Sequence, residues 1–219
     1  MKTRILYYII AWFTAWGTLS SCSDNRGSTA PGTMQYPEAS PYIGKHIPDM
    51  TLDVFHRNEI RELRLSQYRG KWLILFFYPG DFTFVCPTEL KEMSEYYPKF
   101  QEAGAEIISI STDSVHVHRA WHTHHEDIKK VTYPMASDRS GRLSRALGAY
   151  VPDKGTAVRA SFVVDPDGKI IAYEVTDDSI GRSASELFRK FEAAKAVRDG
   201  DGGFCPANWH AGDEMVTPK

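Results

Sequence analysis

The sequence predicts an α/β protein in which helices cover both faces of a mixed central sheet. Three observations lead to this prediction. Strand and helix patterns alternate between residues 72 and 125, two strand patterns flank a tight-turn sequence near residue 166, and a capped helix pattern follows them. Alternating elements favour parallel strands, and a late antiparallel hairpin makes the sheet mixed.

The folded part of the chain opens with two short strand patterns. Residues 50–55 and 60–65 flank the turn-like pair Arg57-Asn58, which predicts a hairpin. Residues 72–78 then read Trp-Leu-Ile-Leu-Phe-Phe-Tyr, a continuously apolar run between glycine and proline. Such a run is typical of a central strand that is buried on both faces.

A helix is predicted to start at Cys86 and to run towards Phe100. Pro87 suits the first turn of a helix, and apolar residues then recur at spacings of three and four. Residues 106–111 follow as a second central strand. Residues 114–125 predict another helix, which begins at a polar cap.

The last elements are a hairpin and a closing helix. Residues 159–164 and 169–174 flank the turn sequence Asp-Pro-Asp-Gly, so these two strands are expected to pair antiparallel. Ser183 and Glu186 match a capping box before the helical pattern of residues 187–197. The predicted helix therefore has a defined start.

Past Gly200 the chain is rich in glycine and irregular, and this tail carries Cys205. The order of elements fits a thioredoxin-like fold. The chain has no internal repeat, and its 42% hydrophobic content over 219 residues suffices for one well-buried domain, expected at residues 42–219.

The N-terminus has the pattern of an export signal. Lys2 and Arg4 precede an apolar run over residues 5–16, and small and polar residues follow, so residues 1–21 read as a cleaved signal. The run is shorter than the about 20 apolar residues that a membrane-spanning helix needs. The sequence Leu-Ser-Ser-Cys at its end resembles a bacterial lipobox, which predicts lipidation of Cys22.

Residues 22–41 are rich in Ser, Gly, Thr and Pro and are expected to form a flexible tether. A tether behind a lipidated Cys22 predicts an exported, membrane-anchored lipoprotein that faces the periplasm. Two alternatives stay open. Cys22 could be a spare thiol behind an ordinary signal, or translation could start at Met34 and leave a cytoplasmic enzyme without a tether.

The charge balance argues against a polyanionic partner. The 26 basic and 28 acidic side chains are spread along the chain and give a formal net charge of −2. Nucleic-acid binding usually requires a concentrated basic surface. We therefore expect no nucleic-acid partner.

Cys86 is the first candidate for chemistry because of its place at a strand-to-helix junction. The first turn of a helix has unpaired amides, and the helix dipole places about half a positive charge there. This environment favours the thiolate, which is the nucleophilic form of cysteine. A helix start alone is weak evidence, however, because many cysteines near helix ends only pack.

The surrounding segment is more specific. Residues 79–89 read Pro-Gly-Asp-Phe-Thr-Phe-Val-Cys-Pro-Thr-Glu, which resembles the active-site segment of the peroxiredoxins. The resemblance extends over residues 42–214 and implies that Cys86 attacks the peroxide. It also implies that the Thr83 hydroxyl bonds sulfur and peroxide oxygen, and that Pro79 helps to exclude water.

Two charged residues belong to the same resemblance. Arg159, at the start of a predicted strand, resembles the catalytic arginine of the family and would hold the thiolate and stabilise charge on the departing oxygen. Glu89 is expected to orient that arginine.

The segment around Cys205, Phe-Cys-Pro-Ala-Asn-Trp, resembles the resolving-cysteine motif of typical two-cysteine peroxiredoxins. This implies a sulfenic acid at Cys86 that condenses with Cys205 of another subunit. The resemblance thus implies a homodimer, and a ring of dimers is compatible with it. A thioredoxin-like or flavoprotein disulfide reductase would then be required. No cofactor is expected.

Two other functions compete. A thiol:disulfide oxidoreductase would share the fold but needs a Cys-x-x-Cys pair, and Thr83 and Glu89 occupy both positions for the partner thiol. A non-catalytic binder, with Cys86 and Cys205 in a permanent bridge between subunits, would instead have inert thiols.

Two further groups of side chains are expected to be structural. Trp72, Trp121 and Trp209 are predicted to pack rather than to stack on a ligand. Five histidines crowd the helix pattern near residue 120, and two of them, His118 and His122, share a helical face as metal ligands do. No carboxylate or cysteine completes a site, so a helix that exposes its imidazoles to solvent is expected.

Overall fold

The computed structural model describes residues 42–200 and 202–217. The predicted signal, the tether and Cys22 lie outside these residues. Within them, no helix combines the length and the apolar character needed to cross a membrane.

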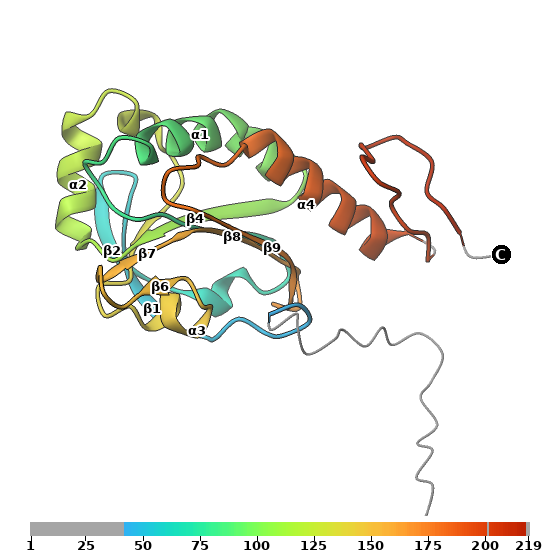
Figure 1. Ribbon diagram of the computed structural model, residues 1–219, viewed down its shortest axis with the longest axis horizontal. Coiled ribbons are helices and arrows are strands. Elements are labelled where there is room, and N and C mark those ends of the chain that lie inside the picture. Colours follow the sequence, from blue (N-terminus) through green and yellow to red (C-terminus); the bar gives the residue numbers. More distant parts are fainter. Residues whose placement is uncertain (1–41, 201, 218–219) are drawn as a thin grey trace, which may run out of the picture. The chain divides into compact units, whose positions relative to one another are not determined.

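A seven-stranded mixed sheet forms the centre of the described part, with strand order β2-β1-β5-β4-β3-β8-β9 (Figure 1). Its strands are β1 (Thr51–His56), β2 (Glu59–Arg64), β3 (Trp72–Phe77), β4 (Ala105–Ser111), β5 (Met135–Ser137), β8 (Arg159–Val164) and β9 (Ile170–Thr176). β4 runs parallel to β3 and β5, whereas β8 runs antiparallel to β3 and β9. The predicted mixed sheet and both predicted hairpins are confirmed.

The remaining elements are short or helical. They are the helices α1 (Cys86–Glu102), α2 (Val115–His124), α3 (Arg142–Ala146) and α4 (Ala184–Asp199), the 3-10 turns η1 (Leu65–Tyr68) and η2 (Ile128–Lys130), and the strand pair β6 (Tyr150–Val151) and β7 (Thr156–Ala157). Hydrophobic periodicity predicted neither α3 nor the β6–β7 pair, because elements this short do not complete a repeat.

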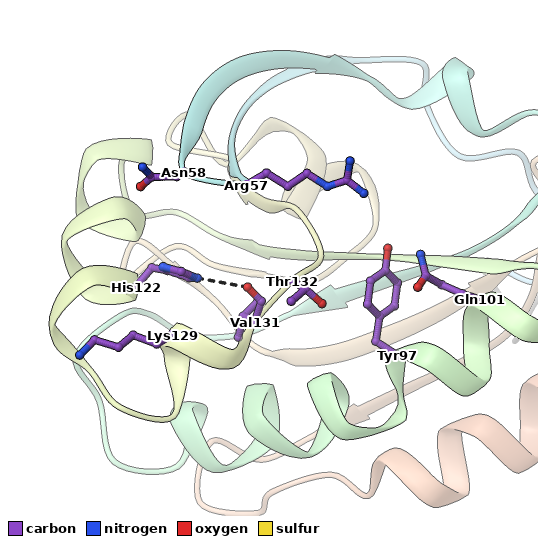
Figure 2. Close-up of a pocket in the computed structure, with 8 residues that line it drawn as sticks. All are labelled: Arg57, Asn58, Tyr97, Gln101, His122, Lys129, Val131 and Thr132. Carbon is purple, nitrogen blue, oxygen red and sulfur yellow. Dashed lines mark hydrogen bonds between the residues drawn. The ribbon is translucent and has the colours of Figure 1, made fainter.

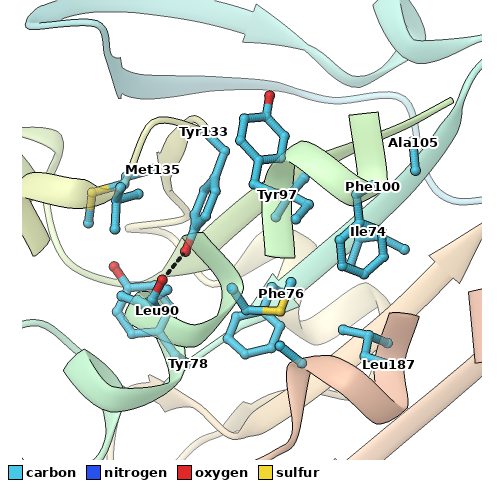
Figure 3. Close-up of a cluster of buried hydrophobic side chains, with 14 of the residues drawn as sticks. Ile74, Phe76, Tyr78, Leu90, Tyr97, Phe100, Ala105, Tyr133, Met135 and Leu187 are labelled. Atoms are coloured by element: carbon cyan, nitrogen blue, oxygen red, sulfur yellow. Dashed lines mark hydrogen bonds between the residues drawn. The ribbon is translucent and has the colours of Figure 1, made fainter. Parts of the chain in front are cut away.

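β3 divides the core into two layers because successive side chains of a strand point to opposite faces. Ile74 and Phe76 join the cluster that α1, α2 and α4 cover, while Leu73 and Leu75 join the cluster that α3 covers. Figure 3 shows the first cluster, in which α1, α4 and the central strands contribute side chains. Helices therefore cover both faces, as predicted, but the three long helices share one of them.

The helix starts agree with the predictions only in part. Cys86 is the first residue of α1, as expected. At α4, the Ser183 hydroxyl accepts a hydrogen bond from the Glu186 amide at 3.3 Å, but the Glu186 carboxylate pairs with Arg189. The reciprocal half of the capping box is therefore wrong, since the nearby guanidinium is the stronger partner. Ser114 caps α2 with its carbonyl oxygen and makes no side-chain capping bond.

Candidate active site

Cys86 lies at the first turn of α1, directly behind the loop that follows β3. Its side chain is fully buried. Amide groups in the first turn of a helix and the helix dipole face this position, so the local backbone favours negative charge there. The thiol is free in the described chain.

Arg159 reaches Cys86 from the start of β8, the strand that pairs with β3. Its Nη1 donates to the Cys86 sulfur at 3.3 Å and to Glu89 Oε2 at 2.6 Å. Its Nε donates to the Asp178 carbonyl at 2.9 Å, so the guanidinium is held on two sides. Burial opposes its charge, but the hydrogen bond to Cys86 and the charge of Glu89 outweigh burial and raise the pKa of Arg159.

Glu89 accepts hydrogen bonds from two buried guanidinium groups, those of Arg159 and Arg182. Arg182 donates to it from Nε at 2.9 Å and from its own backbone amide at 2.8 Å. The Arg182 guanidinium also lies 3.6 Å from the centre of the Phe76 ring. Burial lowers the pKa of Arg182, and the bond to Glu89 opposes that effect.

Arg182 was not predicted from the sequence. It lies 93 positions from Glu89 along the chain, and no local pattern marks it. The fold alone brings the segment before α4 against the first turn of α1. The structure thus places Cys86, Arg159 and Glu89 in one cluster, and it adds Arg182.

Thr83 and Pro79 lie on the loop before α1. The Thr83 hydroxyl donates to the Gly80 carbonyl at 2.9 Å, and it makes no hydrogen bond to the Cys86 sulfur among the contacts of the described residues. Its hydrogen is therefore committed to the loop, and its oxygen remains able to accept a hydrogen from a substrate. Pro79 is half-buried and Pro87 is buried.

Cys205 lies on the tail, which folds back on α4. Its sulfur is 3.6 Å from the Ala193 carbonyl, and the neighbouring Arg189 donates to the Trp209 carbonyl at 2.9 Å. Burial raises the pKa of the Cys205 thiol, and the charge of Arg189 opposes this shift. Cys205 is also a free thiol, so the two cysteines are not joined within the described chain.

Two cavities lie near the helices of the described part, and Cys86 lines neither of them. One of about 430 Å³ lies between the β1–β2 turn and α1, and none of the predicted site residues lines it. Figure 2 shows this cavity, with Arg57 and Asn58 on the turn and Tyr97 and Gln101 on the helix. The second cavity, of about 440 Å³, has Glu89 and Arg182 among its lining residues.

The histidines do not form the solvent-facing row that was expected. His118 is fully buried, so the prediction of a solvent-exposed imidazole is wrong for this residue. Across the described ranges, no group of three or more His, Cys, Asp or Glu side chains is arranged to hold a metal ion. Trp72, Trp121 and Trp209 are all buried, in line with their predicted packing role.

Comparison with known proteins identifies the family. The model of the AhpC/TSA family matches residues 43–173, which is more than half of the chain. This chain belongs to the AhpC/TSA family. Alkyl hydroperoxide reductase C of Salmonella typhimurium is 44% identical over 177 residues, which cover 81% of this chain and 95% of the relative. The protein of that name from Staphylococcus epidermidis is 40% identical over 178 residues, which cover 80% and 94%.

Solved structures of AhpC/TSA proteins agree with the fold. The crystal structure of Enterococcus faecalis AhpC is 44% identical, with a TM-score of 0.73 over 75% of this chain and 98% of the other. The reduced 2-Cys peroxiredoxin of Plasmodium vivax is 31% identical, with a TM-score of 0.77 over 81% and 94%. The predicted thioredoxin-like fold and the resemblance to two-cysteine peroxiredoxins are therefore confirmed.

Proposed function

We propose that the protein is a thiol peroxidase that reduces hydrogen peroxide and small organic hydroperoxides. The observation that carries this proposal is the 3.3 Å contact between the Arg159 guanidinium and the Cys86 sulfur in a buried site. A guanidinium there would hold the thiolate and would stabilise negative charge that develops on a departing oxygen. The relatives named alkyl hydroperoxide reductase C support this substrate class.

In the first step, the Cys86 thiolate attacks one oxygen of the peroxide. The S–O bond forms as the O–O bond breaks, which oxidises the sulfur to a sulfenic acid, and the other oxygen leaves as an alcohol or water after it gains a proton. Arg159 would neutralise the departing oxygen. The Thr83 hydroxyl, which donates its hydrogen to the Gly80 carbonyl, would accept a hydrogen bond from the peroxide and so orient it.

In the second step, the Cys205 thiol condenses with the sulfenic acid and releases water, so that a disulfide forms. An external dithiol, from a thioredoxin-like protein or a flavoprotein reductase, then returns both cysteines to thiols by exchange. Because burial raises the pKa of Cys205, the thiol is its main form at neutral pH, and condensation requires its deprotonation.

A homodimer is part of this proposal, with Cys86 and Cys205 of different subunits facing one another. The described surface exposes large apolar side chains that an assembly would cover. Phe84 is 96% exposed, and Phe82, Val175 and Ile180 are each more than half exposed. A ring of dimers is compatible with several such surfaces on one subunit.

Two matched substitutions in the full chain test the peroxidase function. We expect Cys86→Ser to abolish rapid thiol loss at micromolar peroxide, as followed by stopped-flow fluorescence, because Cys205, the other thiol in the described residues, has only the partly exposed Arg189 near it. Cys205→Ser should leave the first step unchanged and should stop disulfide formation. Undiminished oxidation of Cys86→Ser by peroxide would contradict the proposal.

We further propose that Cys22 carries a lipid and that the tether holds the enzyme at a membrane, facing the periplasm. The lipobox-like sequence before Cys22 supports this localisation. A cysteine with two or three acyl chains suffices for stable anchoring. Mass spectrometry of the native N-terminus should find an acylated Cys22, whereas a chain that starts at Met34 would contradict the anchor and point to the cytoplasm.

A further inference from the structure

Three buried side chains form a polar cluster below the loop that precedes Cys86. They are Tyr78 directly after β3, Asp81 on the loop and His118 on α2, and we call them the Tyr-Asp-His cluster. The Tyr78 hydroxyl donates to Asp81 Oδ1 at 2.7 Å, and His118 Nδ1 lies 2.7 Å from Asp81 Oδ2. The side chains of His118 and Asp81 are both inaccessible to solvent.

His118 faces an oxygen acceptor on each side of its ring. Nδ1 meets the Asp81 carboxylate, and Nε2 lies 3.2 Å from the Ala136 carbonyl on β5. The imidazole therefore links the loop before Cys86 to β5 through its two ring nitrogens.

Asp81 is also held through its backbone. Its amide donates to Asp113 Oδ2 at 2.8 Å, and the same oxygen accepts from the Ser111 hydroxyl at 2.8 Å. The loop is thus attached to β3 and α2 through the Asp81 side chain and to the end of β4 through its amide. These bonds stop Asp81 from moving independently of the sheet.

Phe82, the residue after Asp81, has a backbone conformation that requires the loop to be held in place. Phe82 has a φ of 54°, in the left-handed region that side-chain-bearing residues rarely adopt. The residue is 58% exposed, so burial does little to hold it in place. An unfavourable backbone conformation persists where its surroundings impose it, and such positions cluster at functional sites. Thr83 then closes the turn on Gly80, three residues before Cys86.

We propose that the His118–Asp81 pair is a positioning device for peroxide reduction. By holding Asp81, the pair imposes the turn at Phe82 and so sets the Thr83 hydroxyl relative to Cys86. This inference rests on the proposed peroxidase function and adds to it a pair of positioning residues that do not touch the sulfur. The Cys86 sulfur itself is contacted by Arg159.

This division of roles gives a test with two rates. In the full chain, His118→Gln should lower the second-order rate constant for hydrogen peroxide by roughly 10- to 100-fold, the size expected when a reacting group is slightly misplaced. The rate at which iodoacetamide alkylates Cys86, followed by mass spectrometry of the Cys86 peptide, should not fall. Alkylation needs the sulfur, which Arg159 holds, but it does not need the Thr83 hydroxyl.

His116→Gln is the matched control, because His116 is an exposed residue of the same helix. It should leave both rates unchanged. A milder variant, Tyr78→Phe, keeps the buried ring and removes one bond to Asp81. It should slow peroxide reduction by roughly 2- to 10-fold, as loss of one hydrogen bond predicts, again without slower alkylation.

A peroxide rate for His118→Gln within twofold of the wild-type rate would overturn the inference. A parallel fall of the two rates would also overturn it, because the pair would then support the fold in general. If His118→Gln does not fold, the test uses Tyr78→Phe instead: an unchanged peroxide rate, or a parallel fall of the peroxide and alkylation rates, would overturn the inference. Failure of the proposed function itself is distinguishable, since the wild-type chain would then not react rapidly with peroxide.

Discussion

Arg159→Ala should lower the second-order rate constant for hydrogen peroxide by roughly 100- to 1000-fold, which is the range for loss of one preorganised donor from a catalytic site. Arg159 places one nitrogen 3.3 Å from the Cys86 sulfur and 2.6 Å from Glu89. Its removal takes away the cation that would stabilise both the thiolate and the departing oxygen. Stopped-flow measurements under single-turnover conditions would report the loss.

Arg159→Lys separates charge from geometry. A lysine keeps the charge, but one ammonium group cannot reproduce the planar fork that bonds sulfur, carboxylate and the Asp178 carbonyl together. We therefore expect a loss between those of the wild type and Arg159→Ala. Arg198→Ala, which removes an arginine paired with Asp165 elsewhere on the surface, is the control and should keep the wild-type rate. Wild-type peroxide reduction by Arg159→Ala would contradict the proposed role.

Glu89→Ala should destabilise the protein by about 3–5 kcal/mol, because it leaves two guanidinium groups buried without their counter-ion. The side chains of Glu89, Arg159 and Arg182 are exposed by only 2%, 4% and 1%. Solvent therefore cannot replace the lost carboxylate. The free energy of unfolding, measured by urea denaturation, would show the effect.

The same variant should also slow peroxide reduction, because Arg159 would lose the partner that orients it towards Cys86. Glu95→Ala is the control, since Glu95 is an exposed residue of the same helix and should change stability little. A change below about 1 kcal/mol for Glu89→Ala would mean that the carboxylate is not the main partner of the two arginines.

Most of the fold could be predicted from local sequence patterns. The β3 segment is apolar at every position, and the structure buries every one of its side chains, so its place at the centre of the sheet could be predicted. Pro87 marked the start of α1 and thereby the position of Cys86. The short elements α3, β6 and β7 could not be predicted, because they depend on tertiary contacts rather than on a repeating pattern.

The candidate site could be predicted from the sequence only in part. Cys86, Thr83 and Glu89 lie in one continuous motif, and Arg159 was recognised by its likeness to the family motif. No sequence motif marks Arg182, although its backbone amide and its Nε donate to Glu89 at 2.8 and 2.9 Å. His118 was expected at the surface, since helical spacing shows which residues share a face but does not show which element covers that face.

The sequence by itself determined the order of the elements, the start of the helix at Cys86 and the family to which the site belongs, because each depends on residues that are close together in the chain. Only the tertiary structure decided which charged groups meet. Arg159 and Arg182 converge on Glu89, and His118 pairs with Asp81, across separations of 37 to 93 positions. The physical reason is that a buried charge requires a partner, and the packing of strands and helices determines which partner is within reach.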